Sequence, residues 1–319
     1  MITETYTVSR PYICDNLTIF LIHGEEKLPE ASLLTLQEAL EQKKLIVHET
    51  RNVNELEIEN LSLEEVYLQA GDIVKGGLQD RVFAYDMIVS ARSGKIPIGA
   101  FCVEQGRWRP RREETGEMEP DSLFRSAAER VHTKDLKFAV LAYRSQGEVW
   151  NKVSEAQEKL SAKLGASVKA RRSATSLQLT LEDEKVDQKV GRYVRELSPI
   201  IGANGGPGGV IGYAFAINGK VNSADLYGSK ALFRKLWLKL LKASAVEAVA
   251  EFEEGKRFNP VTADDVVAFL NDAARHNPVE KQVTSRIRLI TRETNKTIVQ
   301  DTRDLERNGA WVHRSCLVK

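Results

Sequence analysis

The segment IPIGAFCV, residues 96–103, has the pattern of a β-strand buried on both faces, because apolar side chains occupy both parities. The chain then runs directly into EQGRW, residues 104–108, which brings a carboxylate, an amide, a guanidinium and an indole together. A core strand holds its end rigidly, and rigid strand ends can fix polar groups for binding or chemistry. The pattern predicts one of two things: a functional site here, or a structural ion pair of Glu104 and Arg107 beside a tryptophan, Trp108, that packs into the core.

The first hundred residues are predicted to be mostly strand, from period-2 alternation and β-branched content. One helix is expected at residues 33–43, with Leu33, Leu36, Ala39 and Leu40 on one face. We therefore expect a β-rich unit over residues 1–115, sandwich- or barrel-like and mostly antiparallel. The strands predicted in it are residues 17–22, 45–49, 56–60, 66–69, 82–91 and 96–103.

Residues 116–319 are expected to form an α+β unit that packs with the first as one compact body. A helix capped by Asp121 or Ser122 is predicted to run to about Val131, after the charged loop at 109–120. Asn218-Gly219 predicts a β-hairpin, because both residues accept positive φ. The remaining predicted elements are helices at 148–164 and 186–197, a long amphipathic helix from Ser229 to about Phe252, a helix from Thr262, and an antiparallel meander of strands at 283–291, 297–302 and 311–318.

The predicted meander is rich in charge. Arg286, Arg288 and Arg292 share one parity and are expected to form cross-strand pairs with Asp301 and Asp304 on a solvated face. Earlier in the chain, Asp225 and Tyr227 follow the predicted hairpin and form a further polar strand end, which we rank below the EQGRW segment.

Charge and composition exclude several classes of protein. Forty-six Lys and Arg against forty-five Asp and Glu leave a net charge of +1, so no long-range field favours nucleic acid or an anionic membrane. No apolar run is long enough to span a bilayer. The N-terminus has no signal-peptide pattern, so the cytoplasm is the default location, or export if a signal was removed. Cys14, Cys102 and Cys316 are too dispersed for a disulfide framework or thiolate metal site.

A second unusual stretch is AGDIVKGGLQDRV, residues 70–82. Its three glycines break a strand, and its polar residues include Asp72, Gln79 and Arg81. A bulge or turn with solvated polar residues also accounts for this composition. If the stretch lies beside the EQGRW segment, the two form one site.

Candidate roles follow from residue chemistry. Glu104 and Asp72 are the acid/base candidates, and Arg81 and Arg107 suit an anion. Gln79 and Gln105 would orient a ligand, and Trp108 would stack against it. The residues predict no metal site and no particular cofactor, and a homo-oligomer is compatible with the sequence. Phosphate-loop, metalloprotease and serine-hydrolase motifs are absent from it.

The succession of these segments resembles the family of the ARG and rhodanese-phosphatase-superfamily-associated protein domain over almost the whole chain. Its most specific marker is CVEQGRW at 102–108, supported by G-x-x-x-x-G-G-x-Q-x-R at 71–81. The resemblance implies a bacterial or archaeal α+β protein associated with ADP-ribosylglycohydrolases and phosphatases, and hence with ADP-ribose, nucleotide or phosphosugar metabolism. Family members often have Lys or Gln at the position of Leu78. The resemblance therefore implies a role for Gln79 and Arg81 rather than for Leu78. The N-terminal stretch also looks like that of exported relatives.

Two hypotheses for function result. The first is binding or processing of a phosphorylated, ribose-containing small molecule by the site residues above. The second is a non-catalytic binding or assembly module in which the EQGRW residues form a structural polar network; it predicts that Glu104 and Arg107 pair with each other or with backbone and reach no open pocket. Whether the chain is an enzyme stays open between them. Nucleic-acid binding through RWRPRR at 107–112 and KARR at 169–172 is disfavoured by the neutral charge balance.

Overall fold

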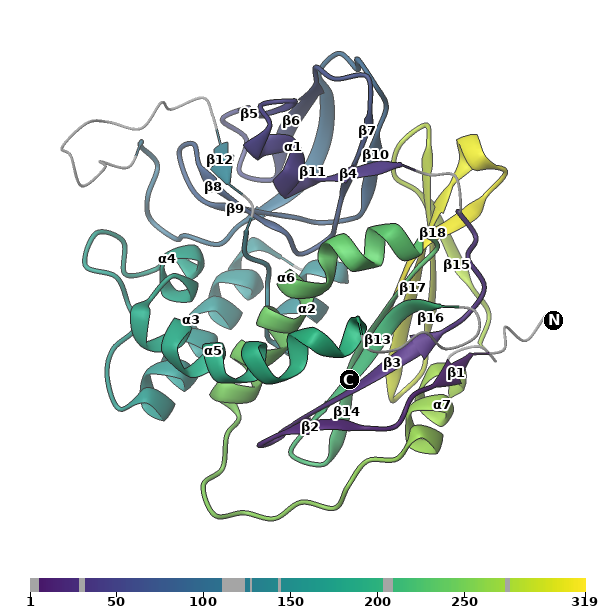
Figure 1. Cartoon of the computed structure of the whole chain (residues 1–319). Helices are drawn as coiled ribbons and strands as arrows, with labels where there is room; N and C mark the ends of the chain where they lie inside the picture. Colours follow the sequence, from purple (N-terminus) through teal and green to yellow (C-terminus); the bar gives the residue numbers. More distant parts are fainter. Residues whose placement is uncertain are drawn as a thin grey trace. The chain divides into compact units, whose positions relative to one another are not determined.

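The computed structural model describes residues 6–28, 32–110, 124–126, 128–142, 145–202, 209–272 and 276–319. Residue contacts divide the chain into two compact units (Figure 1). The inserted unit comprises Ser32–Val190, and the split unit combines Met1–Ala31 with Gly191–Lys319. The division expected between residues 115 and 116 falls inside the inserted unit. The grouping differs because an N-terminal strand pairs with strands from the last third of the chain.

The inserted unit contains two sheets. The larger is a six-stranded antiparallel sheet in the order β12-β8-β9-β11-β6-β5, and the smaller has the order β10-β7-β4, with β4 and β7 parallel. Their bounds are β4 Leu33–Thr35, β5 Leu45–Glu49, β6 Glu55–Asn60, β7 Glu65–Leu68, β8 Ile73–Gly76, β9 Arg81–Phe83, β10 Met87–Val89, β11 Ile96–Cys102 and β12 Phe124–Ser126.

Helices complete the inserted unit. They are α1 Leu36–Glu41, α2 Lys134–Leu141, α3 Gln146–Leu164, α4 Leu177–Leu181 and α5 Glu184–Leu197, the last of which crosses into the split unit. Thr35 and Glu38 form a reciprocal capping box, so α1 begins at Leu36 and not at Leu33 as predicted.

Two other local predictions in the inserted unit were wrong. Phe124–Ser126 form strand β12, where a helix running to Val131 was predicted, because this segment pairs with β8. The predicted strand at 82–91 is divided into β9 and β10, which belong to different sheets. In both cases tertiary pairing overrides the local pattern.

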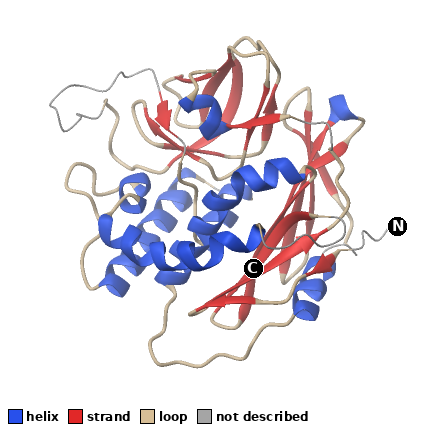
Figure 2. Ribbon diagram, in the orientation of Figure 1, coloured by secondary structure: helices blue, strands red, loops and turns tan. Residues whose placement is uncertain are grey.

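The split unit is built on one nine-stranded sheet with the order β1-β3-β13-β14-β18-β17-β16-β15, and β2 pairs with β3. Figure 2 shows this long sheet in red with helices α6 and α7 beside it. The bounds are β1 Thr7–Val8, β2 Tyr12–Cys14, β3 Leu17–His23, β13 Val210–Ile217, β14 Lys220–Tyr227, β15 Val279–Gln282, β16 Ile287–Glu293, β17 Thr297–Asp304 and β18 Ala310–Val318, with helices α6 Lys230–Ala250 and α7 Ala263–Asp272.

The predicted hairpin and meander are confirmed. Asn218 and Gly219 have φ of 53° and 71° between β13 and β14, as a tight hairpin requires. Strands β16, β17 and β18 are consecutive antiparallel neighbours. With the helices, these elements confirm the α+β fold class. Among the residues described here, no helix is long and apolar enough to cross a membrane.

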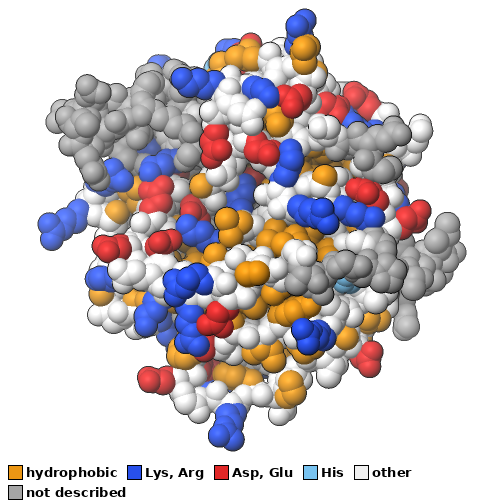
Figure 3. Space-filling model, viewed as in Figure 1, with side chains coloured by type: hydrophobic (Ala, Val, Ile, Leu, Met, Phe, Trp, Pro, Cys, Tyr) orange, Lys and Arg blue, Asp and Glu red, His pale blue; other side chains and the backbone are white. Residues whose placement is uncertain are grey.

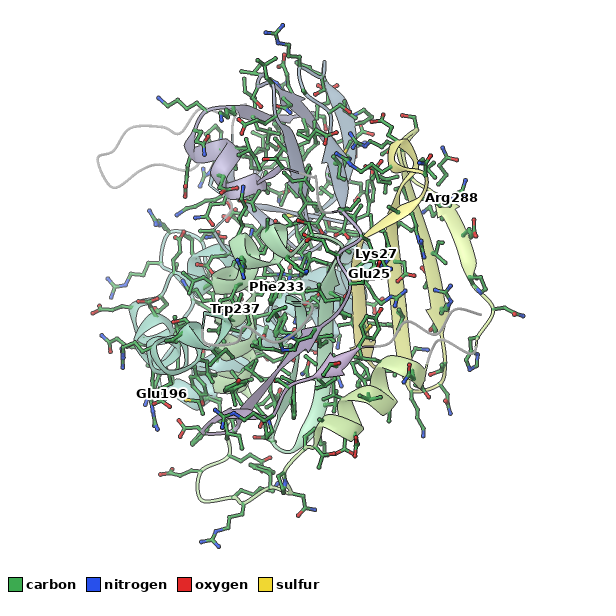
Figure 4. The ribbon with its side chains drawn as sticks, turned by 45° about the vertical axis from the view of Figure 1, so that its right-hand side comes forward. Glu25, Lys27, Glu196, Phe233, Trp237 and Arg288 are labelled. Atoms are coloured by element: carbon green, nitrogen blue, oxygen red, sulfur yellow. The ribbon has the colours of Figure 1, made fainter. Side chains whose placement is uncertain are left out.

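Helix α6 follows its sequence pattern closely. Its apolar stripe is buried, and Figure 4 labels two of the members, Phe233 and Trp237, on this helix; the stripe consists of Phe233, Leu236, Trp237, Leu240 and Leu241. Phe233 stacks on Tyr227 of β14, with ring centroids 5.8 Å apart. The stripe thus attaches α6 to the sheet through aromatic packing.

The N-cap residue of α6, Ser229, is expected to stabilise the helix. The Ser229 hydroxyl accepts a hydrogen bond from the backbone N–H of Leu232 at 3.3 Å. We expect Ser229→Ala to lower the free energy of unfolding by about 1 kcal/mol, because one helix N–H loses its acceptor. Urea denaturation measures this change, and Ser229→Asn should retain most of the stability. An equal loss in both variants would argue against a capping role.

The charge pairs expected in the meander are present in part. Arg286 contacts Asp304 at 2.7 Å, and Arg292 contacts Asp301 at 3.2 Å, whereas Arg288 pairs with Glu280. Both aspartates are 0% exposed, so the expectation of a fully solvated face was wrong. Elsewhere, Figure 3 shows cationic and anionic side chains intermingled on the face in view, as expected for a net charge of +1.

Candidate functional site

Strand register brings the two unusual sequence stretches together inside the inserted unit. The segment at 70–82 is a hairpin of β8 and β9, with Gly76 and Gly77 at φ of 131° and 54° where the chain turns. Strand β11 pairs with β9 so that Cys102 lies opposite Arg81. The loop after β8 therefore lies beside the EQGRW segment that follows β11. Two segments about 25 residues apart in the sequence become one cluster.

Glu104 lies at the centre of this cluster and is 0% exposed. Its carboxylate oxygen Oε1 is 2.8 Å from Arg107 Nε, and Oε2 accepts the backbone N–H of Asp80 at 3.0 Å. The backbone carbonyl of Glu104 accepts a hydrogen bond from the Gln79 amide at 3.0 Å. Both carboxylate oxygens are thus engaged within the protein.

Arg107 is the main cross-link of the cluster. Its Nη1 donates to the carbonyls of Gly77 at 2.9 Å and Arg109 at 2.6 Å, and its Nη2 donates to the carbonyl of Gly76 at 3.2 Å. With the Glu104 ion pair at Nε, each of the three guanidinium nitrogens contacts an oxygen of the protein, and the residue is only 9% exposed. Arg107 therefore fastens the β8–β9 turn to the end of β11.

Arg81 is fully buried and contacts other members of the cluster than Arg107 does. Its Nη1 donates to Gln79 Oε1 at 2.8 Å, and its Nη2 is 3.5 Å from a carboxylate oxygen of Glu49. The guanidinium lies 5.5 Å from the ring centroid of Trp108, whose side chain is 49% exposed. Among the described residues, Arg81 Nε has no hydrogen-bond partner. The indole therefore separates a buried cation from solvent.

Three members of the cluster were not selected from the sequence. Asp80 is fully buried and accepts hydrogen bonds from the Ser176 hydroxyl at 2.7 Å and from the backbone N–H of Gly76 at 3.1 Å. Glu49, at the end of β5, accepts the backbone N–H of Leu78 at 3.2 Å. Asp80 was visible as a polar loop residue, but no local pattern identifies Glu49 or Ser176, which come from distant segments.

Two predicted site residues lie elsewhere in the inserted unit. Asp72 precedes β8, at the opposite end of that strand from the glycine turn, and forms a β-bridge with Arg130. The Gln105 side chain is exposed, and its backbone carbonyl accepts a hydrogen bond from the Thr175 hydroxyl at 2.6 Å. The structure thus joins Gln79, Arg81, Glu104, Arg107 and Trp108 by direct contacts and leaves these two outside that set.

The chemistry of the cluster is dominated by opposite charges in contact. The carboxylates of Glu49, Asp80 and Glu104 surround the guanidiniums of Arg81 and Arg107. Burial raises the pKa of the neighbouring Cys102 thiol above its ordinary value, so this cysteine is a neutral thiol and not an activated nucleophile. Across the described part of the chain, no group of three His, Cys, Asp or Glu side chains could hold a metal ion.

Asp225 and Tyr227, the lower-ranked polar strand end, lie on β14 in the split unit. Both are buried, and Asp225 Oδ1 is 3.1 Å from His313 Nε2 of β18. The His313 ring stacks on Tyr227 with centroids 4.7 Å apart. This polar group belongs to the long sheet and is separate in sequence and unit from the EQGRW cluster.

Comparison with protein families identifies the chain. The sequence profile of the ARG and rhodanese-phosphatase-superfamily-associated protein domain matches residues 5–317. The chain belongs to this family. In this member of the family, the CVEQGRW marker forms the end of β11 and the Glu104–Arg107 cross-link. No curated protein and no solved structure matches the chain.

Proposed function

We propose that this protein is a non-catalytic binding module in which the EQGRW residues form a structural network. One observation carries the proposal: every nitrogen of the Arg107 guanidinium and both carboxylate oxygens of Glu104 already have partners within the inserted unit. A catalytic carboxylate needs an oxygen that can reach substrate, and an anion-binding arginine needs free donors. These two side chains have neither and instead hold the turn and strand end together.

The proposed ligand is a phosphorylated, ribose-containing small molecule, bound at the surface that this network holds in place. Trp108 supports this assignment, because a half-exposed indole over a cation can stack a base or sugar. A second candidate function is processing of the same ligand class with Glu104 and Asp72 as acid/base groups, because Glu104 belongs to the same cluster as Trp108.

Ligand titration separates these proposals. ADP-ribose, NAD and ribose 5-phosphate would be titrated calorimetrically into wild type, Trp108→Ala and the exposed neighbour control Gln105→Ala. We expect Trp108→Ala to weaken binding about ten-fold or more, because a lost stacking contact costs about 1–3 kcal/mol. Its melting temperature should change little, and Gln105→Ala should bind like wild type.

Chromatography of each ligand after incubation tests the second candidate. Unchanged ligand supports a binding module. Product formed by wild type and lost in Glu104→Gln would instead establish processing and contradict the non-catalytic proposal. Failure of all three ligands to bind would contradict the proposed ligand class.

A further inference from the structure

We propose that Asn308 is a covalent modification site, at which the folded protein slowly loses ammonia and gains aspartate or isoaspartate. The site lies in the split unit and is independent of the EQGRW cluster and of the function proposed for it. The dipeptide Asn-Gly occurs at 204–205, 218–219 and 308–309. In such a pair the asparagine side chain can approach the next backbone nitrogen closely, because glycine has no Cβ. The first pair lies outside the described residues, and the structure distinguishes the other two.

The reaction needs only water as a further reactant. The backbone nitrogen of Gly309 attacks Cγ of Asn308, and a C–N bond forms. The Cγ–Nδ2 bond breaks, and Nδ2 leaves as ammonia with the proton that the Gly309 nitrogen gives up. Water then opens the resulting cyclic imide at Cγ to give aspartate, or at the backbone carbonyl to give isoaspartate. No atom changes its oxidation state.

The two described Asn-Gly pairs have nearly the same φ angles. The angle is 53° at Asn218 and 55° at Asn308, and it is 71° at both glycines. Asn218 lies in the turn between β13 and β14, and Asn308 lies in the turn between β17 and β18. A difference in reactivity between the two asparagines should therefore come from the contacts and packing around each turn.

The fold holds the Asn218 side chain in place. Its Oδ1 accepts a hydrogen bond from Asn16 Nδ2 at 3.1 Å, and its Nδ2 donates to the backbone carbonyl of Glu251 at 2.7 Å. Gly219 is closely packed, because a Cβ added there would lie 2.5 Å from the backbone oxygen of Asn259. Ring closure at Asn218 would break both side-chain hydrogen bonds, and a product carboxylate would face the Glu251 carbonyl without a donor between them.

The Asn308 turn is open. The Asn308 side chain is exposed and has no hydrogen-bond partner among the described residues. A Cβ added at Gly309 would meet no atom within 4 Å, so the imide and the longer isoaspartate backbone have room. A hydrogen bond from the Gly309 N–H to the carbonyl of Asp304, at 2.9 Å, must open first. Conversion at Asn308 should therefore be faster than at Asn218 but slower than in the unfolded chain.

Mass spectrometry of the full chain measures both rates. Folded wild type would be incubated at neutral pH beside a sample in urea, and both would be compared with protein that was not incubated. Chymotrypsin suits the digestion, because cleavage after Phe215 separates Asn218 from Asn204. In the folded protein we expect conversion at Asn308 to be at least about ten-fold faster than at Asn218, where two side-chain hydrogen bonds must open. In urea the two rates should be similar.

A variant tests the protection of Asn218 directly. Asn16→Ala removes the donor to Asn218 Oδ1 and should raise the conversion rate at Asn218. Asn308 in the same chain is the internal control, and its rate should not change. If Asn16→Ala does not fold, the comparison of folded wild type with the urea sample still tests the site.

Several results would overturn the proposal. Equal rates at Asn308 and Asn218 in the folded protein, or faster conversion at Asn218, would show that the contacts around the turns do not decide reactivity. Unmodified Asn308 in the folded protein, with conversion in urea, would show that the Asp304 hydrogen bond closes the site. An unchanged Asn218 rate in folded Asn16→Ala would contradict the protective role of the side-chain hydrogen bonds. The EQGRW proposal is unaffected by these results, because its readout is ligand binding.

Discussion

Replacement of Arg107 by alanine is expected to lower the free energy of unfolding by about 3–5 kcal/mol, the cost of leaving a buried ion pair without one partner. The variant leaves Glu104 Oε1 without its 2.8 Å contact, in a residue that is 0% exposed. It also removes the donors to the carbonyls of Gly76 and Gly77, which turn the chain between β8 and β9. Because the two segments are held to each other by this side chain, both should loosen together.

Urea denaturation of matched variants measures this effect. Arg109→Ala removes an exposed arginine two residues away and should change stability by less than about 0.5 kcal/mol. Arg107→Lys keeps the charge but not the forked geometry, so its loss should fall between those of wild type and Arg107→Ala. A stable Arg107→Ala variant with impaired ligand binding would show that Arg107 acts on ligand and would contradict the structural role.

The second large effect is expected at Asp301. Asp301→Asn should lower the free energy of unfolding at pH 7 by about 3 kcal/mol, because three guanidiniums lose a carboxylate that they share. Asp264→Asn, an exposed aspartate in the first turn of α7, is the control and should cost much less. A small loss in Asp301→Asn, equal to that of the control, would contradict this electrostatic account.

The pH dependence of the free energy of unfolding tests the same prediction independently. Burial acts to raise the pKa of Asp301, but the hydrogen bond from Arg314 and the charges of Arg314, Arg303 and Arg292 outweigh it and hold that pKa below its ordinary value of 3.8. A carboxyl with a lowered pKa stabilises the folded state above its unfolded pKa, and this stability is lost as the pH falls through the folded pKa. Wild type and Asp301→Asn should therefore differ at pH 7 and pH 5, and the difference should shrink as the pH falls below about 4 towards the folded pKa. Denaturation across this range measures the difference, and a constant gap at all pH values would contradict it.

Local sequence signals determined many elements. Asn218-Gly219 accepts positive φ at both turn positions, and Ser229 offers a hydroxyl to the first turn of α6, so neither feature depends on distant residues. The same reasoning failed at Phe124–Ser126, because pairing with β8 decides that segment. The boundary at residue 115 was drawn from a change of composition, whereas β3 pairs with β13 across almost 200 residues.

The candidate site shows the same division between local and long-range information. The sequence by itself determined that polar groups follow the β11 strand and that glycines interrupt the chain at 71–77, because both are properties of neighbouring residues. Only the tertiary structure decided that Glu104 and Arg107 face each other and the β8–β9 turn, and that Glu49 and Ser176 join them. Strand register decides which segments meet. Because burial removes water from the charged groups, these groups then pair with the donors and acceptors that the neighbouring segments supply.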